Sequence, residues 1–280
     1  MFPEMLEFHV ADYIRYFVEW LNIACGPAFS FFDDTVLAMI LKVEEMLVFI
    51  PWWAWIMLVA LLSWKITHHM GKTIIPVILL LSIGAFGLWD KSMETLAVVI
   101  IAVLLSLLIG IPLGIAMAVS DRVNAIFIPI LDAMQTMPSF VYLIPALMLF
   151  SLGKVPAVVA SVIYAVPPVQ RLTNLGIRQV SETVQEAAVA FGATPWQLMR
   201  EVRLPLAMPS ILAGVNQTTM MALAMVVIAS MVGAGGLGEE VLIAVNRIDI
   251  GKGFEAGWAI VVLAILIDRL SQGAARNGER

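Results

Sequence analysis

A series of long apolar runs without a charged side chain limits the fold of this sequence more than any other feature. A transmembrane helix needs about 20 consecutive apolar residues to cross the hydrocarbon core of a bilayer. Composition agrees, because 61% of the residues are hydrophobic and 13% are charged, whereas soluble domains average roughly 25% charged residues. We therefore predict an all-α polytopic membrane protein with about seven transmembrane helices. The runs cover residues 46–64, 73–89, 95–120, 133–153, 155–170, 204–238 and 256–267.

Two of these runs are short for a complete crossing. Residues 155–170 could instead be tilted or partly re-entrant, and residues 256–267 need Phe254 and its neighbours to span. Proline and glycine interrupt several runs. In lipid, a backbone group freed by such a break must find an internal partner, so a broken helix lines a cavity or packs against a neighbour. Ordinary kinking is the alternative interpretation.

The basic residues of the predicted loops indicate how the chain is oriented. If the loop at 171–203 is cytoplasmic, alternation of the runs places residues 65–72, 121–132 and 268–280 on the same side. These three segments and the loop at 171–203 together hold 10 of the 16 lysine and arginine residues. Because cytoplasmic loops carry an excess of basic residues, we predict an outside N-terminus and an inside C-terminus, with residues 271–280 as a short cytoplasmic tail.

The first 45 residues differ from the predicted transmembrane domain at residues 46–270. They hold eight acidic and two basic side chains, interleaved with aromatic residues. This mixture predicts amphipathic helices that lie on the outer membrane surface, although a poorly ordered, solvated tail would have a similar composition. The start of the chain lacks the basic residues of a cleavable signal peptide, so we expect this segment to remain on the mature protein.

Several functions are disfavoured by what the sequence contains. A net charge of −5 without a basic and aromatic stripe argues against a nucleic-acid partner. Cys25 is the single cysteine, and His9, His68 and His69 do not approach the spacing of metal ligands. The apolar runs contain no charged residue that could relay protons or ions. We therefore expect no metal site and no ion-coupled transport in this chain, and another energy source must drive any transport.

Three short motifs resemble known sites and are rejected. Residues 233–238 fit the dinucleotide-binding fingerprint but follow an apolar helix rather than a strand, so we interpret them as a flexible helix terminus. Residues 71–73 resemble the end of a phosphate-binding loop, but Ile66 occupies the position of its first glycine. Residues 216–218 match a glycosylation site inside a membrane run, where polar side chains are better explained as contacts between helices or as pore lining. We predict no catalytic residue, no bound cofactor and no enzymatic activity.

The longest polar stretch between two apolar runs covers residues 181–205. Thr183, followed three residues later by Glu186, fits a capping box that starts a helix. Gly192 fits the position just after a helix, where a left-handed conformation is common. The predicted helix has one face formed by residues at helical spacing, namely Val184, Ala187, Ala188 and Phe191.

A second short helix is predicted directly afterwards. Thr194, Pro195 and Gln197 combine an N-cap, a proline at the first helical position and another capping box. The two helices would form an elbow whose Phe191 and Trp196 offer large apolar anchors to a partner. Packing of the elbow on this protein's own transmembrane helices is the alternative. Small residues that permit close approach of a partner are Ala187, Ala188 and Gly192.

The spacing of residues 186–188, Gly192 and 202–205 resembles the EAA signature of the permease subunits of ABC importers, with Val202 in the place of isoleucine. The resemblance implies that the elbow is a cytoplasmic coupling helix, which enters a groove of a separate ATPase subunit. That partner subunit would bind ATP and magnesium. The resemblance assigns coupling roles to Glu186 as a helix cap, to Ala187, Ala188, Phe191 and Gly192 as docking residues, and to Leu204 and Pro205 as the junction with the next span.

A narrower resemblance covers residues 90–270. Residues 131–145, 216–217 and 231–238 look like those of permeases of importers for glycine betaine, proline and choline. The resemblance implies a homodimer in the lipid of a bacterial or archaeal cell membrane, two ATPase subunits and an extracytoplasmic substrate-binding protein. Few residues follow Arg269, so we expect that binding protein to be a separate subunit.

The substrate-binding residues stay unknown at this stage. Aromatic rings hold trimethylammonium groups through cation–π attraction, but aromatic residues also form belts at the membrane interfaces. A permease for another small polar solute, such as an amino acid or a phosphonate, is the first alternative. An autonomous channel or secondary carrier is the second, and a membrane scaffold the last. The aromatic candidates are Trp89, Phe140, Tyr142 and Tyr164.

Overall fold

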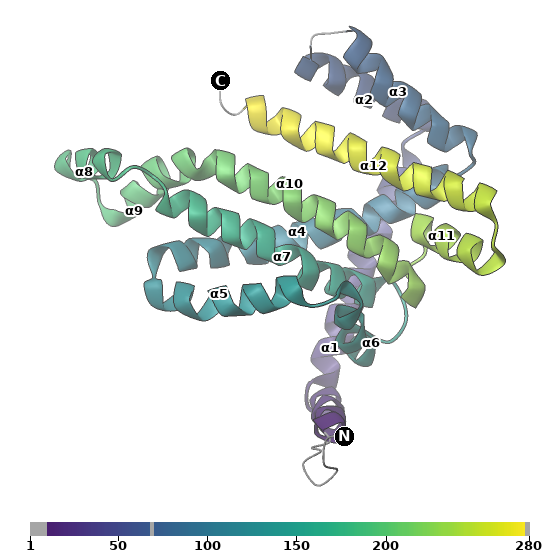
Figure 1. The fold of residues 1–280 in the computed structure, drawn as a ribbon, viewed down its shortest axis with the longest axis horizontal. Coiled ribbons are helices and arrows are strands. Elements are labelled where there is room, and N and C mark those ends of the chain that lie inside the picture. Colours follow the sequence, from purple (N-terminus) through teal and green to yellow (C-terminus); the bar gives the residue numbers. More distant parts are fainter. Residues whose placement is uncertain (1–9, 68–69, 278–280) are drawn as a thin grey trace, which may run out of the picture.

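The computed structural model describes residues 10–67 and 70–277, and within them it is built from helices (Figure 1). The described part therefore confirms the all-α fold. Residues 1–9, which include His9, together with His68, His69 and residues 278–280, lie outside it. In chain order the helices are α1 (Val10–Phe49), α2 (Trp52–Thr67), α3 (Met70–Ala85), α4 (Trp89–Val119), α5 (Asp121–Thr136), the 3-10 helix η2 (Ser139–Tyr142), α6 (Leu143–Phe150), α7 (Lys154–Arg178), α8 (Glu182–Ala190), α9 (Pro195–Gln197), the π-helix η3 (Leu198–Arg203), α10 (Leu204–Ala229), the 3-10 helix η4 (Ser230–Val232), α11 (Gly236–Arg247) and α12 (Ile250–Asn277).

Five helices in the described residues are long and apolar enough to cross a membrane, or six if the bent pair formed by α5 and α6 counts as one span. The predicted count of seven is thus not confirmed. The first two predicted spans correspond to α2 and α3, which have 16 residues each. Conversely, the two runs that seemed short, 155–170 and 256–267, belong to the longer helices α7 and α12, of 25 and 28 residues. Both helices continue past their apolar run into polar residues.

The span predicted at residues 133–153 is broken in the structure. Helix α5 ends at Thr136, and the chain bends by 112° before it continues through Ser139–Phe150. Met137 has an extended backbone, with φ −71° and ψ 137°, as expected for a residue whose helical conformation is blocked by the following proline, Pro138. The single crossing predicted here is therefore corrected to two helices that meet at a sharp bend.

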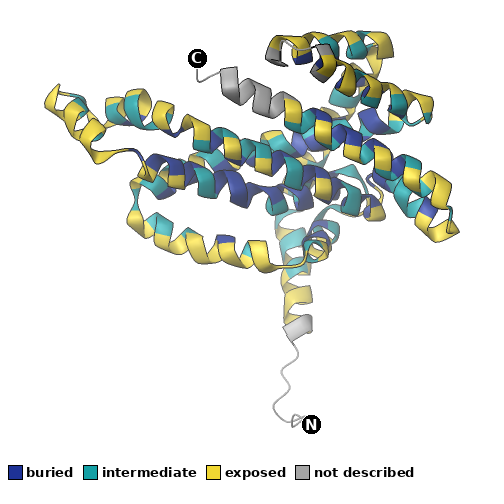
Figure 2. Ribbon diagram, turned by 45° about the horizontal axis from the view of Figure 1, so that its top comes forward, coloured by how far each residue is buried: buried dark blue, intermediate teal, exposed yellow. Residues whose placement is uncertain are grey.

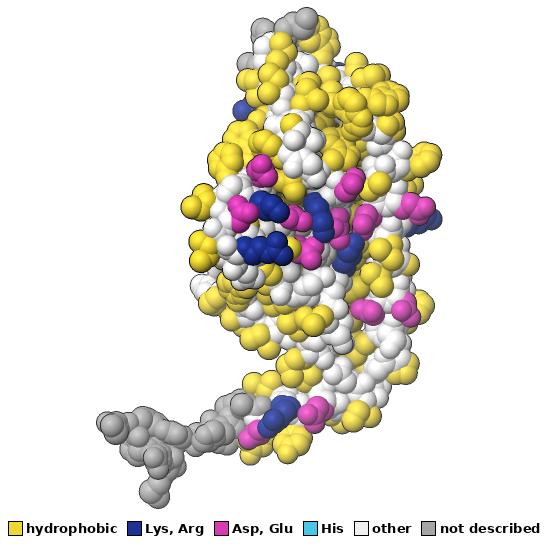
Figure 3. Space-filling model, turned by 90° about the vertical axis from the view of Figure 1, so that its right-hand side faces the viewer, with side chains coloured by type: hydrophobic (Ala, Val, Ile, Leu, Met, Phe, Trp, Pro, Cys, Tyr) yellow, Lys and Arg dark blue, Asp and Glu magenta, His cyan; other side chains and the backbone are white. Residues whose placement is uncertain are grey.

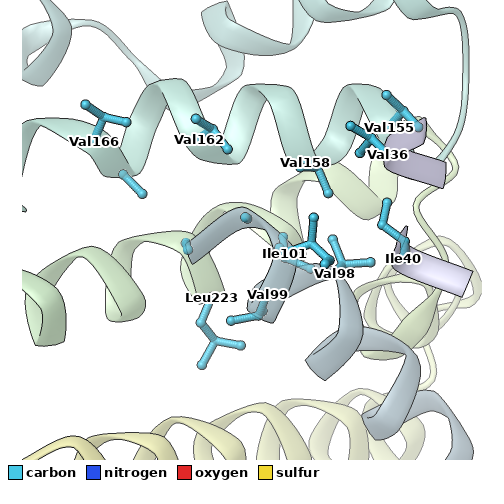
Figure 4. Packing of buried hydrophobic residues seen from close by; sticks show 14 residues of the cluster. Val36, Ile40, Val98, Val99, Ile101, Val155, Val158, Val162, Val166 and Leu223 are labelled. Carbon is cyan, nitrogen blue, oxygen red and sulfur yellow. The ribbon is translucent and has the colours of Figure 1, made fainter. Parts of the chain in front are cut away.

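Helix α7 packs against both α4 and α10 and forms the centre of the bundle. Two glycines of α4 allow α7 to approach closely: a Cβ atom at Gly110 would lie 2.5 Å from Val169 Cγ1, and one at Gly114 would lie 2.7 Å from the carbonyl oxygen of Gln170. Small residues permit such approach between membrane helices. Figure 4 shows a cluster of buried side chains that α4, α7 and α10 share, among them Val98, Val99, Ile101, Val158, Val162, Val166 and Leu223.

Helix α1 departs from the bundle sideways. It is one continuous helix of 40 residues rather than the several helices predicted, and its N-terminal part extends away from the other helices (Figures 1 and 2). Its C-terminal part packs into the bundle through the buried side chains of Val36 and Ile40. The amide of Asn22 donates to the carbonyl oxygen of Met148, 3.1 Å away, in α6. Aromatic side chains of the extending part are exposed, including Tyr13, Tyr16, Phe17, Trp20 and Phe31.

The glycine-rich segment at residues 233–238 is well packed, which corrects its interpretation as a flexible helix terminus. Gly235 and Gly236 have positive φ angles of 77° and 73°, and a Cβ atom at Gly235 would lie 2.3 Å from Glu94 Oε1. The backbone N–H of Leu237 donates to Thr95 Oγ1 at 2.8 Å. The glycines therefore let the start of α11 lie directly against the start of α4.

Candidate functional site

The predicted elbow, residues 181–205, is found at one end of the bundle. Helices α8 and α9 project beyond the ends of α7 and α10 (Figure 1), and α8 contains no buried residue. Phe191 and Trp196 are 95% and 70% exposed, which is far from the usual burial of large apolar side chains. The elbow does not fold back onto the transmembrane helices, so it presents a free surface in this chain (Figure 2).

The start of α8 differs from the prediction. The helix begins at Glu182, with Ser181 as the N-cap and without a side-chain cap hydrogen bond. Thr183 and Glu186 therefore lie inside the helix rather than at the two ends of a capping box, so the cap predicted for Glu186 is wrong. The acidic side chain of Glu182 in the first turn still stabilises the N-terminus of α8 by its interaction with the helix dipole.

The end of α8 confirms the prediction for Gly192. Its φ angle is +86°, its N–H donates to the carbonyl oxygen of Val189 at 2.9 Å, and the N–H of Ala193 donates to that of Ala188 at 3.1 Å. These two bonds form a Schellman motif. A Cβ atom at Gly192 would meet no atom within 4 Å. Within this chain, glycine is therefore required for its backbone conformation and not for space.

The second arm of the elbow has the predicted start but not the predicted length. Thr194 and Gln197 form the capping box, with the N–H of Gln197 donating to Thr194 Oγ1 at 3.3 Å and the N–H of Thr194 donating to Gln197 Oε1 at 2.9 Å. This arm then continues without a break through η3 into α10. It is therefore the beginning of a membrane helix and not a separate short helix.

The π-helix η3 has a local cause in the sequence. The N–H of Leu204 donates to the carbonyl oxygen of Met199, five residues earlier, and the next residue, Pro205, has no N–H group. A wider turn moves the proline ring away from the carbonyl group that it would meet in a regular α-helix. Leu204 is half-buried beside Ile177 and Met199, whereas Pro205 is exposed. These two residues join the elbow to α10, as predicted from the motif.

A side chain missed by the sequence analysis fixes the elbow to the bundle. Gln185 Oε1 accepts hydrogen bonds from Arg203 Nε at 2.9 Å and from a terminal guanidinium nitrogen at 2.6 Å. The amide of Gln185 donates to the carbonyl oxygen of Val180 at 2.7 Å. Gln185 thus connects α8 both with the start of α10 and with the end of α7. The motif selected the neighbouring residue Glu186. It did not select Gln185, because the partner of Gln185 lies 18 residues away in the sequence.

The base of the elbow is held by Arg178, at the end of α7. Its guanidinium group donates to the carbonyl oxygen of Met117 at 2.7 Å and to Asn174 Oδ1 at 3.0 Å. It also forms an ion pair of 2.8 Å with Asp121. The amide of Asn174 in turn donates to Asn124 Oδ1 at 2.8 Å. These bonds tie the corner between α4 and α5 to the helix from which the elbow emerges.

The remaining docking residues of the motif are presented to solvent. Glu186, Ala187, Phe191 and Gly192 are exposed, and Ala188 is half-buried. The structure brings them together on one projecting helix and its terminus. Their contact with another protein stays a prediction.

The polar residues 216–218 connect helices, as predicted. The hydroxyl of Thr218 donates to the carbonyl oxygen of Ala165 at 2.8 Å. The amide of Asn216 donates to Asp268 Oδ1 at 3.0 Å. Asn216 and Thr218 thereby bond α10 to α12 and to α7, whereas Gln217 is exposed.

The four aromatic candidates for substrate binding do not share one position. Tyr142 and Tyr164 lie together, with ring centroids 6.1 Å apart, and the hydroxyl of Tyr142 donates to the carbonyl oxygen of Met134. Trp89 packs instead with the hydrophobic residues at the start of α4. Phe140 is 52% exposed. The positions of these four aromatic residues do not identify a substrate-binding site.

Charged side chains form a connected cluster at the end of the bundle opposite the elbow. Lys154 Nζ lies 2.6 Å from Glu44 and 2.9 Å from Glu94. Lys91 Nζ lies 2.8 Å from Glu239 and 3.6 Å from Glu94. Figure 3, which faces this end, shows acidic and basic side chains across its middle. Because these residues belong to α1, α4, α7 and α11, the cluster fixes four helices to one another.

Known proteins resemble this chain in sequence and in fold. Residues 110–277 match the family described as binding-protein-dependent transport system inner membrane component. The glycine betaine/proline betaine transport system permease protein ProW of Escherichia coli (strain K12) is 46% identical over 93% of this chain and 73% of its own length. The glycine betaine transport system permease protein OpuAB of Bacillus subtilis (strain 168) is 46% identical over 94% of this chain and 93% of its own. A chain of the inward-facing MetNI methionine ABC transporter superposes with a TM-score of 0.62, at 24% identity over 69% of this chain and 96% of its own.

Proposed function

Because the chain belongs to the family of binding-protein-dependent transport system inner membrane components, we propose that it is the permease subunit of an ATP-driven importer of glycine betaine or a related compatible solute. One observation carries the proposal of this cargo. Relatives named for glycine betaine transport are 46% identical to this chain over 93% and 94% of its length. The likeness to the methionine transporter, at 24% identity, supports the fold and not its cargo.

The elbow provides the surface for the energy-supplying partner. In our proposal, an ABC ATPase subunit receives α8 and the exposed Phe191 in a groove, and that subunit binds ATP and magnesium and carries out hydrolysis. The coupling set is the one that the motif selects, with Gln185 and Arg203 added from the structure. Glu186 has an exposed position on the docking face in place of its predicted capping role.

Movement of the elbow would reach two membrane helices. Gln185 bonds to Arg203, which precedes α10, and to Val180, which follows α7. A displacement of α8 by the ATPase subunit therefore pulls directly on both. Since α7 and α10 also pack closely against each other, we propose that they move as a unit relative to a second copy of the chain.

The proposed orientation places the elbow in the cytoplasm and the opposite end of the bundle outside. The N-terminus is then outside and the C-terminus inside, with residues 271–280 as the tail and 46–270 as the transmembrane domain. Residues 1–45 lie on the outer side in this proposal, and the contact of Lys154, the first residue of α7, with Glu44 supports that position for the end of α1. A separate extracytoplasmic binding protein would deliver substrate to the outer face of a homodimer in the lipid membrane.

Uptake of radiolabelled glycine betaine tests the proposal. The assay uses cells without osmolyte importers of their own, supplied with this chain and with candidate ATPase and binding subunits, and with choline, proline and methionine as competitors. We expect uptake that requires all three components. Uptake without the ATPase would indicate a channel or secondary carrier. ATP-dependent uptake of another solute would retain the transporter class and reject the osmolyte.

A further inference from the structure

An apolar cavity of about 620 Å³ lies where the end of α1 meets the hairpin of α2 and α3 and the start of α4. Four helices contribute to it, so the cavity is formed by the fold and not by one helix surface. Its lining residues are aliphatic residues, proline, tryptophan and glycine. The walls include Val48 of α1, Trp52 and Ile56 of α2, Leu80 and Gly84 of α3, and Trp89 of α4.

The chemistry of these walls selects an apolar occupant. The lining side chains are apolar except for the indole N–H groups, so they offer few of the roughly 2–4 polar partners that an ordered water molecule needs. A charged or strongly polar solute would lose its hydration without gaining hydrogen bonds. The volume nevertheless falls within the range of about 300–1,000 Å³ that is typical of ligand pockets. The cavity therefore suits a hydrocarbon group of substantial size.

The surroundings of the cavity indicate where such a group comes from. Helices α2 and α3 have 16 residues each, which gives a length of about 24 Å, less than the ~30 Å hydrocarbon core of a bilayer. The cavity lies at the ends where they stop, because α2 begins at Trp52 and α3 ends at Ala85. Trp52 and Trp89 are of the residue type that concentrates at the membrane interface. Large apolar side chains on the hairpin, such as Trp53, Leu61 and Ile78, are exposed.

We propose that this cavity binds one acyl chain of a membrane phospholipid. The acyl chain occupies the space that the short helices leave beside α1 and α4, and it attaches the hairpin to the rest of the bundle. One protein contact already exists at this position, since the indole N–H of Trp55 donates to the carbonyl oxygen of Leu47 at 3.1 Å. The bound lipid adds contacts on the side of α1 and α4, whereas the other side of the hairpin is held by the bond from the Trp258 indole to Ser82 Oγ at 2.8 Å and by packing against α12. Its binding does not depend on the cargo of the transporter.

A leucine at Gly84 is the direct test. A Cβ atom there would meet only Trp89 Cε3, at 3.9 Å, which is ordinary van der Waals contact, so the new side chain extends into the cavity without moving the backbone. Native mass spectrometry of the full-length chain in mild detergent should show one retained phospholipid per wild-type copy and none for Gly84→Leu. The matched control is Gly71→Leu in the same helix, where a Cβ atom meets no atom within 4 Å. It should retain the lipid.

A second measurement retains Gly84, and therefore the cavity, so it remains valid if Gly84→Leu does not fold. The chain is reconstituted in nanodiscs with phospholipids that carry bromine on the acyl chain, which quenches tryptophan fluorescence on contact. Quenching should be weaker in Trp52→Phe/Trp89→Phe, which lacks both tryptophans that line the cavity, than in the control Trp53→Phe, which lacks an exposed tryptophan of the hairpin. Three results would overturn the proposal: a wild-type chain that retains no phospholipid or only detergent, a Gly84→Leu variant that retains as much phospholipid as wild type, or equal quenching in Trp52→Phe/Trp89→Phe and in Trp53→Phe.

Discussion

The guanidinium group of Arg203 donates two hydrogen bonds, of 2.9 and 2.6 Å, to the side-chain carbonyl oxygen of Gln185. The two residues lie on different arms of the elbow, one in α8 and one immediately before α10. The pair therefore converts two adjoining helices into a rigid unit. Without it, α8 would be attached to the bundle mainly through its chain connections and the bond from Gln185 to Val180.

Replacement of Gln185 by leucine should uncouple the elbow. The variant retains the size of the side chain but loses bonds to Arg203 that involve a charged group, which are worth about 1.5–3 kcal/mol. We expect substrate uptake to fall at least about fivefold at unchanged membrane abundance, as measured by uptake and immunoblotting in parallel. Gln179→Leu is the control, because Gln179 is exposed at the end of α7. Equal uptake by the Gln185 and Gln179 variants would contradict this role.

Gly192 should tolerate asparagine better than valine. Both residues add a Cβ atom where no atom lies within 4 Å, so space does not distinguish them. The left-handed backbone does, since it costs most residues about 1–2 kcal/mol, whereas asparagine adopts it more readily. In uptake assays at matched expression, Gly192→Val should be impaired and Gly192→Asn should retain most activity. If both lose activity equally, close docking against a partner and not backbone conformation explains the glycine.

Removal of the Lys154 ammonium group should destabilise the fold. Lys154→Met leaves the carboxylates of Glu44 and Glu94 without the cation between them, which disfavours both in a partly buried position. We expect the free energy of unfolding to decrease by about 1–3 kcal/mol, measured as a lower Tm in detergent. The control is Arg171→Met, whose pair with Asp132 is more exposed and should contribute less than about 1 kcal/mol. An unchanged Tm for Lys154→Met would show that the cluster adds no stability.

Gly114 should not accept a larger residue. A Cβ atom there would lie 2.7 Å from both the carbonyl oxygen of Gln170 and Thr173 Cβ, so Gly114→Leu forces α4 and α7 apart. Such overpacking costs about 1–3 kcal/mol and should appear as a lower Tm and reduced membrane abundance. Gly257→Leu is the matched control in another long helix, because a Cβ atom there meets no atom within 4 Å. A wild-type Tm for Gly114→Leu would be inconsistent with this packing.

The sequence by itself determined the features that depend on neighbouring residues and on composition. The apolar runs predicted an all-helical membrane protein, and helices cover most of each run in the structure. Gly192 and the capping box of Thr194 and Gln197 were predicted correctly, because their hydrogen bonds join residues only a few positions apart. The motif at residues 186–205 likewise indicated the family and the exposed elbow.

Only the tertiary structure decided how these segments meet. Helix α8 starts at Glu182 and not at the predicted capping box. Gln185 of this helix contacts Arg203 and Val180, and no local sequence pattern predicts these contacts. The bend at Pro138 and the lengths of the helices changed the number of possible spans, because hydropathy records where apolar residues occur and not the direction of the chain. Hydrogen bonds and ion pairs between distant residues depend on which helices lie side by side, and that arrangement results from the packing of the whole bundle.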